Sequence, residues 1–249
     1  MRTFCPLVVL AVVAATACTR NFDILQHPPE QTAILTGGPW ASMIYAARVD
    51  GGVVLVDLGW DGDGDALREA LGRLGAAPED VVAVFLTHGH RDHIAAWPSV
   101  AHARFYLGAE EVPGFLGERG YRGFIPRLVR RLWTPERPDP GELDLHPLEG
   151  DTLVAFGGDT VRVFSLAGHT PGSTAYLFRG ILFLGDAVTW TPLRGFHSAR
   201  REYSDDVALS RRNLAALWER LEGLDVAYAC TAHGKCAPMD STFRRDALR

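Results

Sequence analysis

This chain of 249 residues lacks the compositional extremes that mark several special classes of protein, and each absence excludes one class. Four Cys are too few for a small domain built on a disulfide framework. Gly at 26 and Pro at 15 are close to average usage, which excludes collagen-like and low-complexity chains. Lys and Arg number 25 against 30 Asp and Glu, without a block of either sign, so the composition argues against a nucleic-acid partner. The remaining class is one large globular domain or two small ones.

The chain begins with an apolar run, residues 6–17, that is too short to span a bilayer core of about 30 Å as a helix. The run follows Arg2 and ends in three small residues, so residues 1–17 are predicted to be a secretory signal peptide. The same small residues, followed by Cys18, resemble a bacterial lipoprotein box. Cleavage before Cys18 is expected whether the product is a lipoprotein or a soluble exported protein, and an uncleaved anchor is the third interpretation.

The expected location is the periplasmic side of a bacterial membrane or the cell envelope, with membrane attachment through lipidated Cys18. Residues 18–30 contain two adjacent prolines and are predicted to be a tether. Residues 31–249 are then the folded domain.

The first half of the domain alternates strands and helices. Residues 44–49 and 51–59 read as two strands joined at a Gly-Gly turn. A helix follows, which Asp65 is expected to cap and Gly75 to end, because leucines recur between them at helical spacing. Residues 81–86 are continuously apolar, which is typical of a strand buried on both faces.

The second half repeats this order. Residues 175–179 and 181–186 predict a strand, a turn and a strand ending in Asp, residues 207–224 a helix, and residues 226–234 a strand running into His. The alternation alone supports an α/β fold. The repetition of strand, Asp, helix, strand and His favours two sheets packed face to face with helices outside, a four-layer αββα sandwich.

Between the halves, residues 108–146 look irregular and contain one candidate helix at residues 123–133. Its apolar side chains are predicted to form a single stripe: Phe124, Ile125, Leu128, Val129, Leu132 and Trp133. Two interpretations stay open. The helix either packs over the core, or forms a lid beside the active site that touches apolar substrates or a membrane surface.

Three of the nine His lie within Thr87–His93, directly after the apolar strand at residues 81–86. In a loop after a strand, His88 and His90 can turn to one side, while Asp92 and His93 face a second point nearby. Imidazole and carboxylate are ligands of Zn²⁺ and related transition metals. A buried cluster of imidazoles without a metal would leave polar groups competing for partners, so this loop predicts a metal site.

The spacing His88-x-His90-x-Asp92-His93 resembles the signature of the metallo-β-lactamase superfamily. The rest of that pattern follows in order, with a glycine-bounded His169, Asp186 at a strand end, and His233 before Gly234. The resemblance covers roughly residues 32–236 and implies two metal sites. By it, the first metal is held by His88, His90 and His169, the second by Asp92, His93 and His233, and Asp186 bridges the two.

The resemblance implies a metal-dependent hydrolase with two divalent ions, Zn²⁺ first, with Fe or Mn as alternatives. A water shared by the two cations would lose its proton and attack the substrate. Asp92 would also act in catalysis, by accepting a hydrogen bond from that hydroxide and aiming it. Asp57, at the end of an early strand, would orient a ligand His from behind. A turn Asp without that role is the alternative.

The expected partner is a small-molecule substrate with an ester, lactone, thioester or amide bond, and the oligomeric state stays open. Asp186 argues against a dedicated β-lactamase. Glyoxalase II shares several motifs but adds a C-terminal helical region that grips glutathione, whereas only residues 237–249 follow the last motif here. Alternatives to the acyl hydrolase are a phosphodiesterase and a lipoprotein that binds metal without turnover.

Three further features of the sequence concern a possible calcium loop, a possible disulfide and the substrate pocket. Residues 61–65 resemble the start of a calcium loop, but Ala66 and Gly72 stand where an EF-hand needs Gly and Glu, so a polar turn is expected. Cys230 and Cys236 are either a disulfide beside His233 or two thiols. His197 and Arg194 are candidates for the substrate pocket, and five aromatic residues are candidates for its apolar walls: Trp40, Phe115, Phe124, Trp133 and Trp190.

Overall fold

The computed structural model describes residues 31–35, 42–134, 136–156 and 158–249. The predicted signal peptide at 1–17 and the tether at 18–30, including Cys18, lie outside these residues. Across the described ranges, no helix combines the length and the apolar character needed to cross a membrane.

The first sheet has six strands in the order β1-β2-β3-β4-β5-β6. Neighbours from β1 to β3 are antiparallel, and neighbours from β3 to β6 are parallel. The strands are β1 (Gln31–Leu35), β2 (Met43–Val49), β3 (Gly52–Val56), β4 (Val81–Phe85), β5 (Arg104–Gly108) and β6 (Asp144–Leu148). Because the parallel strands end at one edge of the sheet, the loops after β3, β4 and β5 meet there, which is where α/β sheets place ligand sites.

The second sheet also has six strands, in the order β14-β13-β10-β9-β8-β7. Only β10 and β13 run parallel, while the other neighbours are antiparallel. The strands are β7 (Thr152–Phe156), β8 (Asp159–Ser165), β9 (Thr174–Phe178), β10 (Ile181–Phe183), β13 (Tyr228–Cys230) and β14 (Cys236–Pro238). A small hairpin of β11 (Val188–Thr191) and β12 (Gly195–Ser198) lies apart from both sheets.

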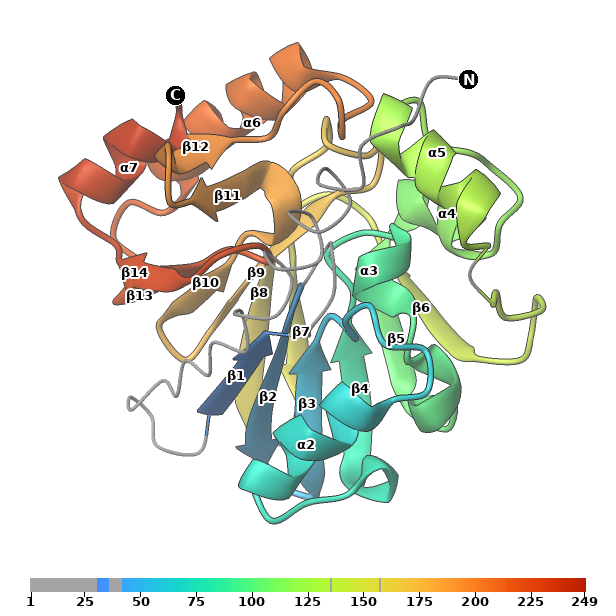
Figure 1. The fold of residues 1–249 in the computed structure, drawn as a ribbon. Helices are drawn as coiled ribbons and strands as arrows, with labels where there is room; N and C mark the ends of the chain where they lie inside the picture. The colour runs from blue at the N-terminus through green and yellow to red at the C-terminus, as the bar shows by residue number, and fades with distance from the viewer. Residues whose placement is uncertain (1–30, 36–41, 135, 157) are drawn as a thin grey trace, which may run out of the picture.

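Helices cover the outer faces of the two sheets (Figure 1). The α-helices are α2 (Asp65–Arg73), α3 (Arg91–Ile94), α4 (Val112–Phe115), α5 (Phe124–Leu132), α6 (Val207–Arg220) and α7 (Ser241–Ala247). The short 3-10 helices are η1 (Pro78–Asp80), η2 (Trp97–Val100), η3 (Ala109–Glu111) and η4 (Gly185–Ala187).

Three hydrophobic clusters separate the layers. The first joins Leu71 of α2 to the outer face of the first sheet. The middle cluster lies between the sheets, where the rings of Phe85 and Tyr176 meet with centroids 5.3 Å apart. The third contains Leu214 and Leu217 of α6 against the second sheet. Helix, sheet, sheet and helix therefore stack in order, and the predicted four-layer αββα sandwich is confirmed.

The helix boundaries differ from the sequence-based expectation in two places. Asp65 is the first helical residue of α2 and not its cap, because Gly64 takes the N-cap position with φ 77°, a left-handed conformation that favours glycine. Gly75, with φ 63°, ends the turn after α2 as predicted. Helix α6 stops at Arg220, about one turn before the predicted end, and the Asp206 side chain caps it by accepting from Leu209 N.

The stretch expected to be irregular, residues 108–146, is more ordered than the sequence suggested. It contains η3, α4 and α5, and it leads into β6, which pairs with β5 at the edge of the first sheet. The candidate helix at residues 123–133 is α5. This segment therefore crosses the carboxyl-terminal edge of the first sheet, where the predicted metal ligands also lie.

Candidate functional site

The loop after β4 brings the predicted ligands of the first half together. His88 and His90 are buried, and His88 Nε2 lies 3.0 Å from His90 Nδ1. Asp92 and His93 follow in α3, a helix of a single turn that turns them away from His90 toward a second point. The loop thus divides its four side chains between two positions, as the spacing predicted.

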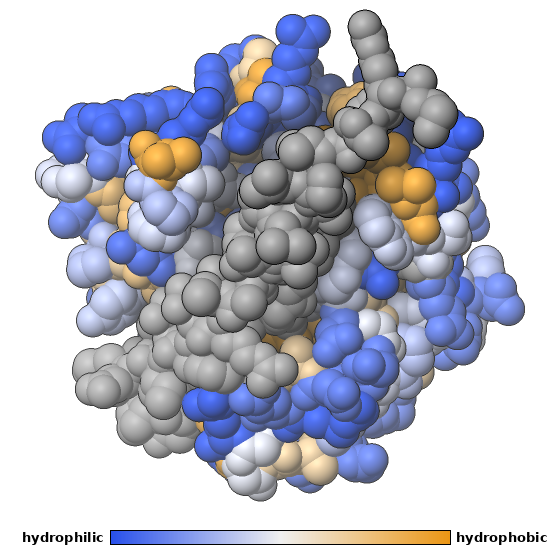
Figure 2. All heavy atoms as spheres, viewed as in Figure 1, coloured by the Kyte–Doolittle hydropathy of each residue, from blue (hydrophilic) through white to orange (hydrophobic). Residues whose placement is uncertain are grey.

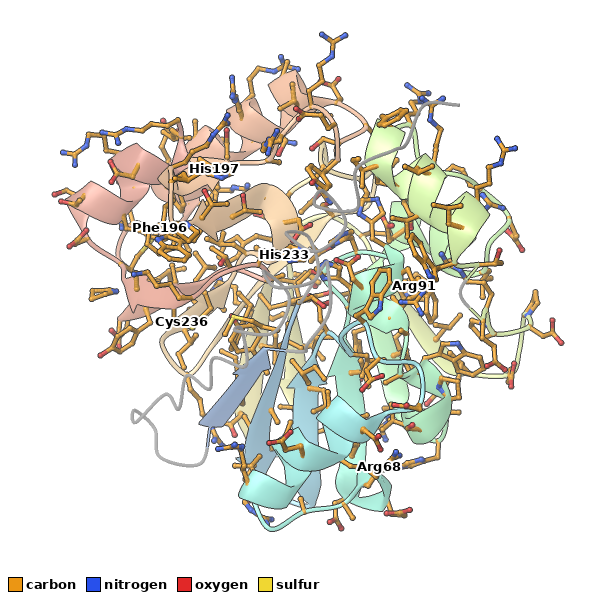
Figure 3. All side chains as sticks on the ribbon, in the orientation of Figure 1. Arg68, Arg91, Phe196, His197, His233 and Cys236 are labelled. Atoms are coloured by element: carbon orange, nitrogen blue, oxygen red, sulfur yellow. A yellow bond between two sulfur atoms is a disulfide. The ribbon has the colours of Figure 1, made fainter. Side chains whose placement is uncertain are left out.

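The second half supplies three more side chains from three different loops. His169 lies between β8 and β9, Asp186 lies in η4 directly after β10, and His233 lies in the turn between β13 and β14. Figure 3 labels Arg91 from the first half of the chain and His233 from the second, and both lie near the same end of the strands. The structure therefore brings all seven sequence-predicted site residues into one cluster.

The cluster consists of two groups of side chains that could each hold a metal ion. One is His88, His90, His169 and Asp186, and the other is Asp92, His93 and His233. Asp186 lies between them, because its Oδ2 is 3.5 Å from His169 Nε2 and its Oδ1 is 3.4 Å from His233 Nε2. This carboxylate has the position that a bridging ligand requires.

Three buried atoms in the cluster have no hydrogen-bond partner among the described residues: His90 Nε2, His93 Nε2 and Asp186 Oδ1. Buried polar atoms normally find partners, since leaving one unsatisfied costs about 1–3 kcal/mol. Imidazole nitrogens and carboxylate oxygens that converge in this way suit a transition metal such as zinc. The residues present therefore fit a pair of divalent cations.

Burial governs the protonation of the first group. It lowers the pKa of His88 and His90 well below the usual histidine value, with neighbouring imidazoles adding to the effect. Burial also lowers the pKa of His169, although the Asp186 carboxylate opposes the shift. Neutral imidazole is the form that binds a metal, so this group is already in its binding form near neutral pH.

Carboxylates govern the second group. Burial alone would lower the pKa of His93, but Asp92 and Asp57 outweigh it and raise that pKa to about 10. His233 also has a raised pKa, because Asp186 and Asp92 together outweigh its burial. The two groups therefore differ in how strongly protons compete for their nitrogens.

Asp57 contacts the site from behind, in the manner that the sequence suggested. Its Oδ2 lies 2.8 Å from His93 Nδ1, and the same carboxylate accepts hydrogen bonds from the backbone N and the Oγ1 of Thr87. These contacts fix the ring of His93 with Nε2 directed to the cluster. Asp57 has φ 57°, so the turn after β3 is held in a conformation that is uncommon for a residue with a side chain.

Glu111, at the end of η3, is a functional candidate that the sequence reasoning missed. Its side chain is fully buried and joins two ligand loops. Oε1 accepts from Gly89 N at 2.9 Å and from the Tyr121 hydroxyl, and Oε2 accepts from Thr170 Oγ1 at 2.7 Å and Gly172 N at 3.0 Å. Because Gly89 separates His88 from His90, this carboxylate holds the loop that carries both of them.

The only sequence signal for Glu111 was an acidic pair following an apolar strand, and that pattern does not say which of the two carboxylates turns inward. Glu110 is the outward one, with a side chain that is 77% exposed. Burial raises the pKa of Glu111, and the hydrogen bonds from Tyr121, Thr170, Gly89 and Gly172 oppose that rise.

A cavity of about 310 Å³ opens onto the cluster. Five of the seven predicted site residues line it: His90, Asp92, His169, Asp186 and His233. Ile125, Pro126 and Val129 of α5 form part of its wall, so this helix lies beside the site as the lid interpretation required. His197 also lines the cavity, whereas Arg194 is not among its lining residues.

The predicted aromatic walls are mostly wrong. Trp190 lines the cavity, but Phe115 is buried in the first hydrophobic cluster and Phe124 and Trp133 are exposed. Trp40 lies outside the described residues. Part of this error comes from the expectation that all apolar residues of α5 share one side. The helix instead turns Ile125 and Val129 toward the cavity and leaves Phe124 exposed.

The question left open at Cys230 and Cys236 has an answer in the structure, which joins them in a disulfide. The two residues are cross-strand partners in the β13–β14 hairpin. The turn between them carries His233, so the disulfide closes the hairpin that presents this side chain.

Residues 37–233 match the model of the metallo-β-lactamase superfamily, and the chain belongs to that superfamily. It is 32% identical to a hydroxyacylglutathione hydrolase of Anaeromyxobacter dehalogenans over 146 residues, which are 59% of this chain and 46% of that protein. It is also 28% identical to a probable polyketide biosynthesis zinc-dependent hydrolase of Bacillus velezensis over 154 residues, 60% of this chain and 56% of the relative. The matched segment spans less than half of the hydroxyacylglutathione hydrolases.

Among solved structures, a metallo-beta-lactamase from Pontibacter korlensis covers 92% of this chain and 97% of its own, with a TM-score of 0.66 and 16% identity. At that identity the likeness shows the fold alone. The chain is thus a member of the metallo-β-lactamase superfamily, and both of the relatives described above are named as hydrolases. The family binds divalent metals, and the His and Asp cluster lies where this chain would hold them.

Proposed function

We propose that this protein is a hydrolase that holds two zinc ions in the cluster and cleaves an ester, lactone, thioester or amide bond of a small substrate. His88, His90 and His169 would hold one ion, Asp92, His93 and His233 the other, and Asp186 both. The observation that carries the proposal is the position of Asp186, whose two oxygens face the two groups. A pair of cations held there supplies polarisation of the scissile carbonyl and a water of lowered pKa.

The chain's own residues position the reacting groups. Asp92 lines the cavity, and its Oδ2 lies 3.1 Å from His233 Nε2, so its carboxylate stands beside the cluster where it can accept a hydrogen bond from an attacking water and aim it. Asp57 and Glu111 keep the ligand loops in place. The apolar wall from α5 keeps bulk water away from one side of the bond that breaks.

The charge of the cavity wall favours an anionic substrate. Five arginines line it: Arg91, Arg119, Arg130, Arg137 and Arg200. Its only lining carboxylates in the described part of the chain are Asp92 and Asp186, which are assigned to metals. We therefore expect an acyl substrate that carries a carboxylate or phosphate as well as an apolar part, which is consistent with relatives that are hydroxyacylglutathione hydrolases.

A substrate panel on the zinc-reconstituted protein tests the reaction class, with esters, lactones, thioesters, amides and phosphodiesters supplied in anionic and neutral forms. His90→Ala and Asp186→Ala are each expected to lower turnover more than about a hundredfold, since even indirect supports of metal ligands contribute 10–100-fold. His102→Ala, an exposed histidine outside the cluster, is the matched control. Near wild-type turnover in His90→Ala at equal metal content would refute the proposal.

The proposed location is the cell envelope, with Cys18 lipidated after cleavage of residues 1–17. The support is the sequence of the amino-terminal segment alone. Mass spectrometry of the mature amino terminus in a bacterial host is expected to find a diacylglyceryl group on Cys18, and Cys18→Ser is expected to release the protein from the membrane fraction. A mature chain that retains Met1 would overturn this assignment.

A further inference from the structure

Helix α5 exposes an apolar stripe to solvent. Phe124 is 61% exposed, Leu128 40% and Leu132 57%, and the spacing of four residues places the three on one face of the helix. Beyond α5 and the adjoining Trp133, the exposed large hydrophobic residues in the described ranges are two isolated leucines, Leu153 and Leu193. Figure 2 shows hydrophobic surface over α5 with hydrophilic side chains beside it. Such a gathering marks an interaction surface, whereas scattered residues do not.

The same helix is strongly cationic. Arg127, Arg130 and Arg131 lie within α5 and Arg122 just before it, and all four are exposed. Residues 122–134 contain no Asp or Glu. In the part of the chain that the structure describes, none of the four forms an ion pair, and Arg130 donates a single long hydrogen bond to the Gly117 carbonyl. Their charge is therefore available to an anionic partner.

The exposed stripe is not the face by which α5 packs against the protein, because other residues of the helix do that. Ile125 and Val129 turn toward the protein and line the catalytic cavity together with Pro126. The helix already packs Ile125 and Val129 against the protein, so the outer stripe is the adjoining part of its apolar surface that the described residues leave uncovered. An amphipathic helix with Phe and Leu on one face and Arg beside them is typical of segments that lie in a membrane interface.

A second copy of the chain fits this surface poorly. Nine residues extend about 13 Å, and their outer face cannot supply the roughly 800 Å² per partner of a stable dimer. A symmetric contact would also bring the same arginines against each other. An anionic lipid surface has neither difficulty, because its headgroups attract Arg while its acyl boundary accepts Phe and Leu.

We propose that α5 docks the protein on an anionic lipid surface, with Phe124, Leu128 and Leu132 inserted and Arg127 and Arg131 against the headgroups. The docked face adjoins the face that lines the cavity, because successive residues of an α-helix lie about 100° apart around its axis, so docking brings one wall of the cavity close to the lipid. This interaction does not depend on the hydrolase assignment or on a lipid at Cys18.

Vesicle co-sedimentation of the full chain carrying Cys18→Ser tests the proposal. We expect at least tenfold tighter partitioning to vesicles of phosphatidylglycerol and phosphatidylcholine than to phosphatidylcholine alone. The triple variant Phe124→Ser/Leu128→Ser/Leu132→Ser and the double variant Arg127→Gln/Arg131→Gln are each expected to lose at least tenfold. The control variants replace exposed residues of the same types outside α5. They are Leu153→Ser/Leu193→Ser for the leucines and Arg212→Gln/Arg245→Gln, in α6 and α7, for the arginines.

Thermal melting of each variant establishes that it is folded before its partitioning is compared. Equal partitioning of the α5 variants and their controls would overturn the proposal. So would equal binding to neutral and anionic vesicles. Light scattering without vesicles tests whether a second copy of the chain binds the stripe. A wild-type dimer that becomes a monomer in the triple variant would assign the stripe to self-association and overturn the proposal.

Discussion

At the scale of single residues, the site depends on side chains that do not face the cavity. Asp57 and Glu111 are both buried, and each accepts hydrogen bonds from a ligand loop or its histidine. Such contacts hold a ligand within the narrow range of positions that a metal tolerates. The histidine pattern predicts the metal ligands, but it contains no information about the second set of residues that holds those side chains.

Glu111→Gln tests this role. The amide keeps the shape of the side chain but presents an NH₂ group to backbone N–H donors that now meet a carboxylate oxygen. We expect a 10–100-fold loss of zinc affinity, measured by competition with a chelating dye, because the loop that carries His88 and His90 loosens. Loss of buried hydrogen bonds should also lower the free energy of unfolding by about 1–3 kcal/mol.

Glu110→Gln is the matched control, since the neighbouring carboxylate is exposed and should leave zinc affinity unchanged. If Glu111→Gln lowered stability but bound zinc as tightly as the wild type, Glu111 would be a structural residue without influence on the metal ligands.

At the scale of elements, the sequence predicted strands and motif loops better than the segment between the halves. Strands β4 and β10 could be recognised because each is a short apolar run that ends at a polar motif. Helix α5 was located correctly, but its apolar residues were assigned to one stripe. The structure divides them, because Ile125 and Val129 pack toward the cavity while Phe124 and Leu128 face solvent. Which face of an apolar helix is covered depends on neighbours that its own sequence does not specify.

The β13–β14 hairpin offers a prediction at this scale. Removing its disulfide with Cys230→Ala/Cys236→Ala should destabilise the protein by about 2 kcal/mol, the loop-closure effect expected for so short a loop. The turn that carries His233 should become mobile, so zinc should be lost first from the group formed by Asp92, His93 and His233. Metal content after dialysis, compared with the wild type, measures this.

Reductant supplies the control for that experiment. It should reproduce both effects in the wild type and change nothing further in the double variant. Retention of two zinc ions per chain in the reduced wild type would show that the hairpin holds His233 without its disulfide.

At the scale of the whole molecule, the two halves repeat one unit. In the first half β3, Asp57, α2, β4 and His88 follow in order, and in the second β10, Asp186, α6, β13 and His233 do so. Both units use a parallel strand pair. The repeat was visible in the sequence, and it explains how residues so far apart in the chain meet at one edge of the sandwich. The distances within the cluster, and the different surroundings of its imidazoles, required the structure.

Each predicted metal group takes ligands from both halves, so a bound ion would join the two sheets across the sandwich. Chelation is therefore expected to destabilise the entire domain, beyond any local effect. At a zinc concentration a thousand times the dissociation constant, binding contributes about 4 kcal/mol. For a chain of this size that corresponds to a fall in Tm of roughly 8–16 °C, measured by calorimetry with and without chelator.

This stabilisation should disappear on acidification in two steps. A raised pKa means that protons occupy a nitrogen over a wider range of pH, so His93, with a pKa of about 10, must release a proton before it binds zinc at neutral pH. The pKa values of His88 and His90 are lowered by burial, so protons compete there only well below the usual value of about 6.5. As the pH falls from 8 to 5, the zinc content should drop first to one ion per chain, with a partial loss of Tm, and only then to none. A single step from two ions to none, or a chelated protein that melts at the same temperature as the zinc form, would contradict the assignment of two unequal metal groups that join the halves.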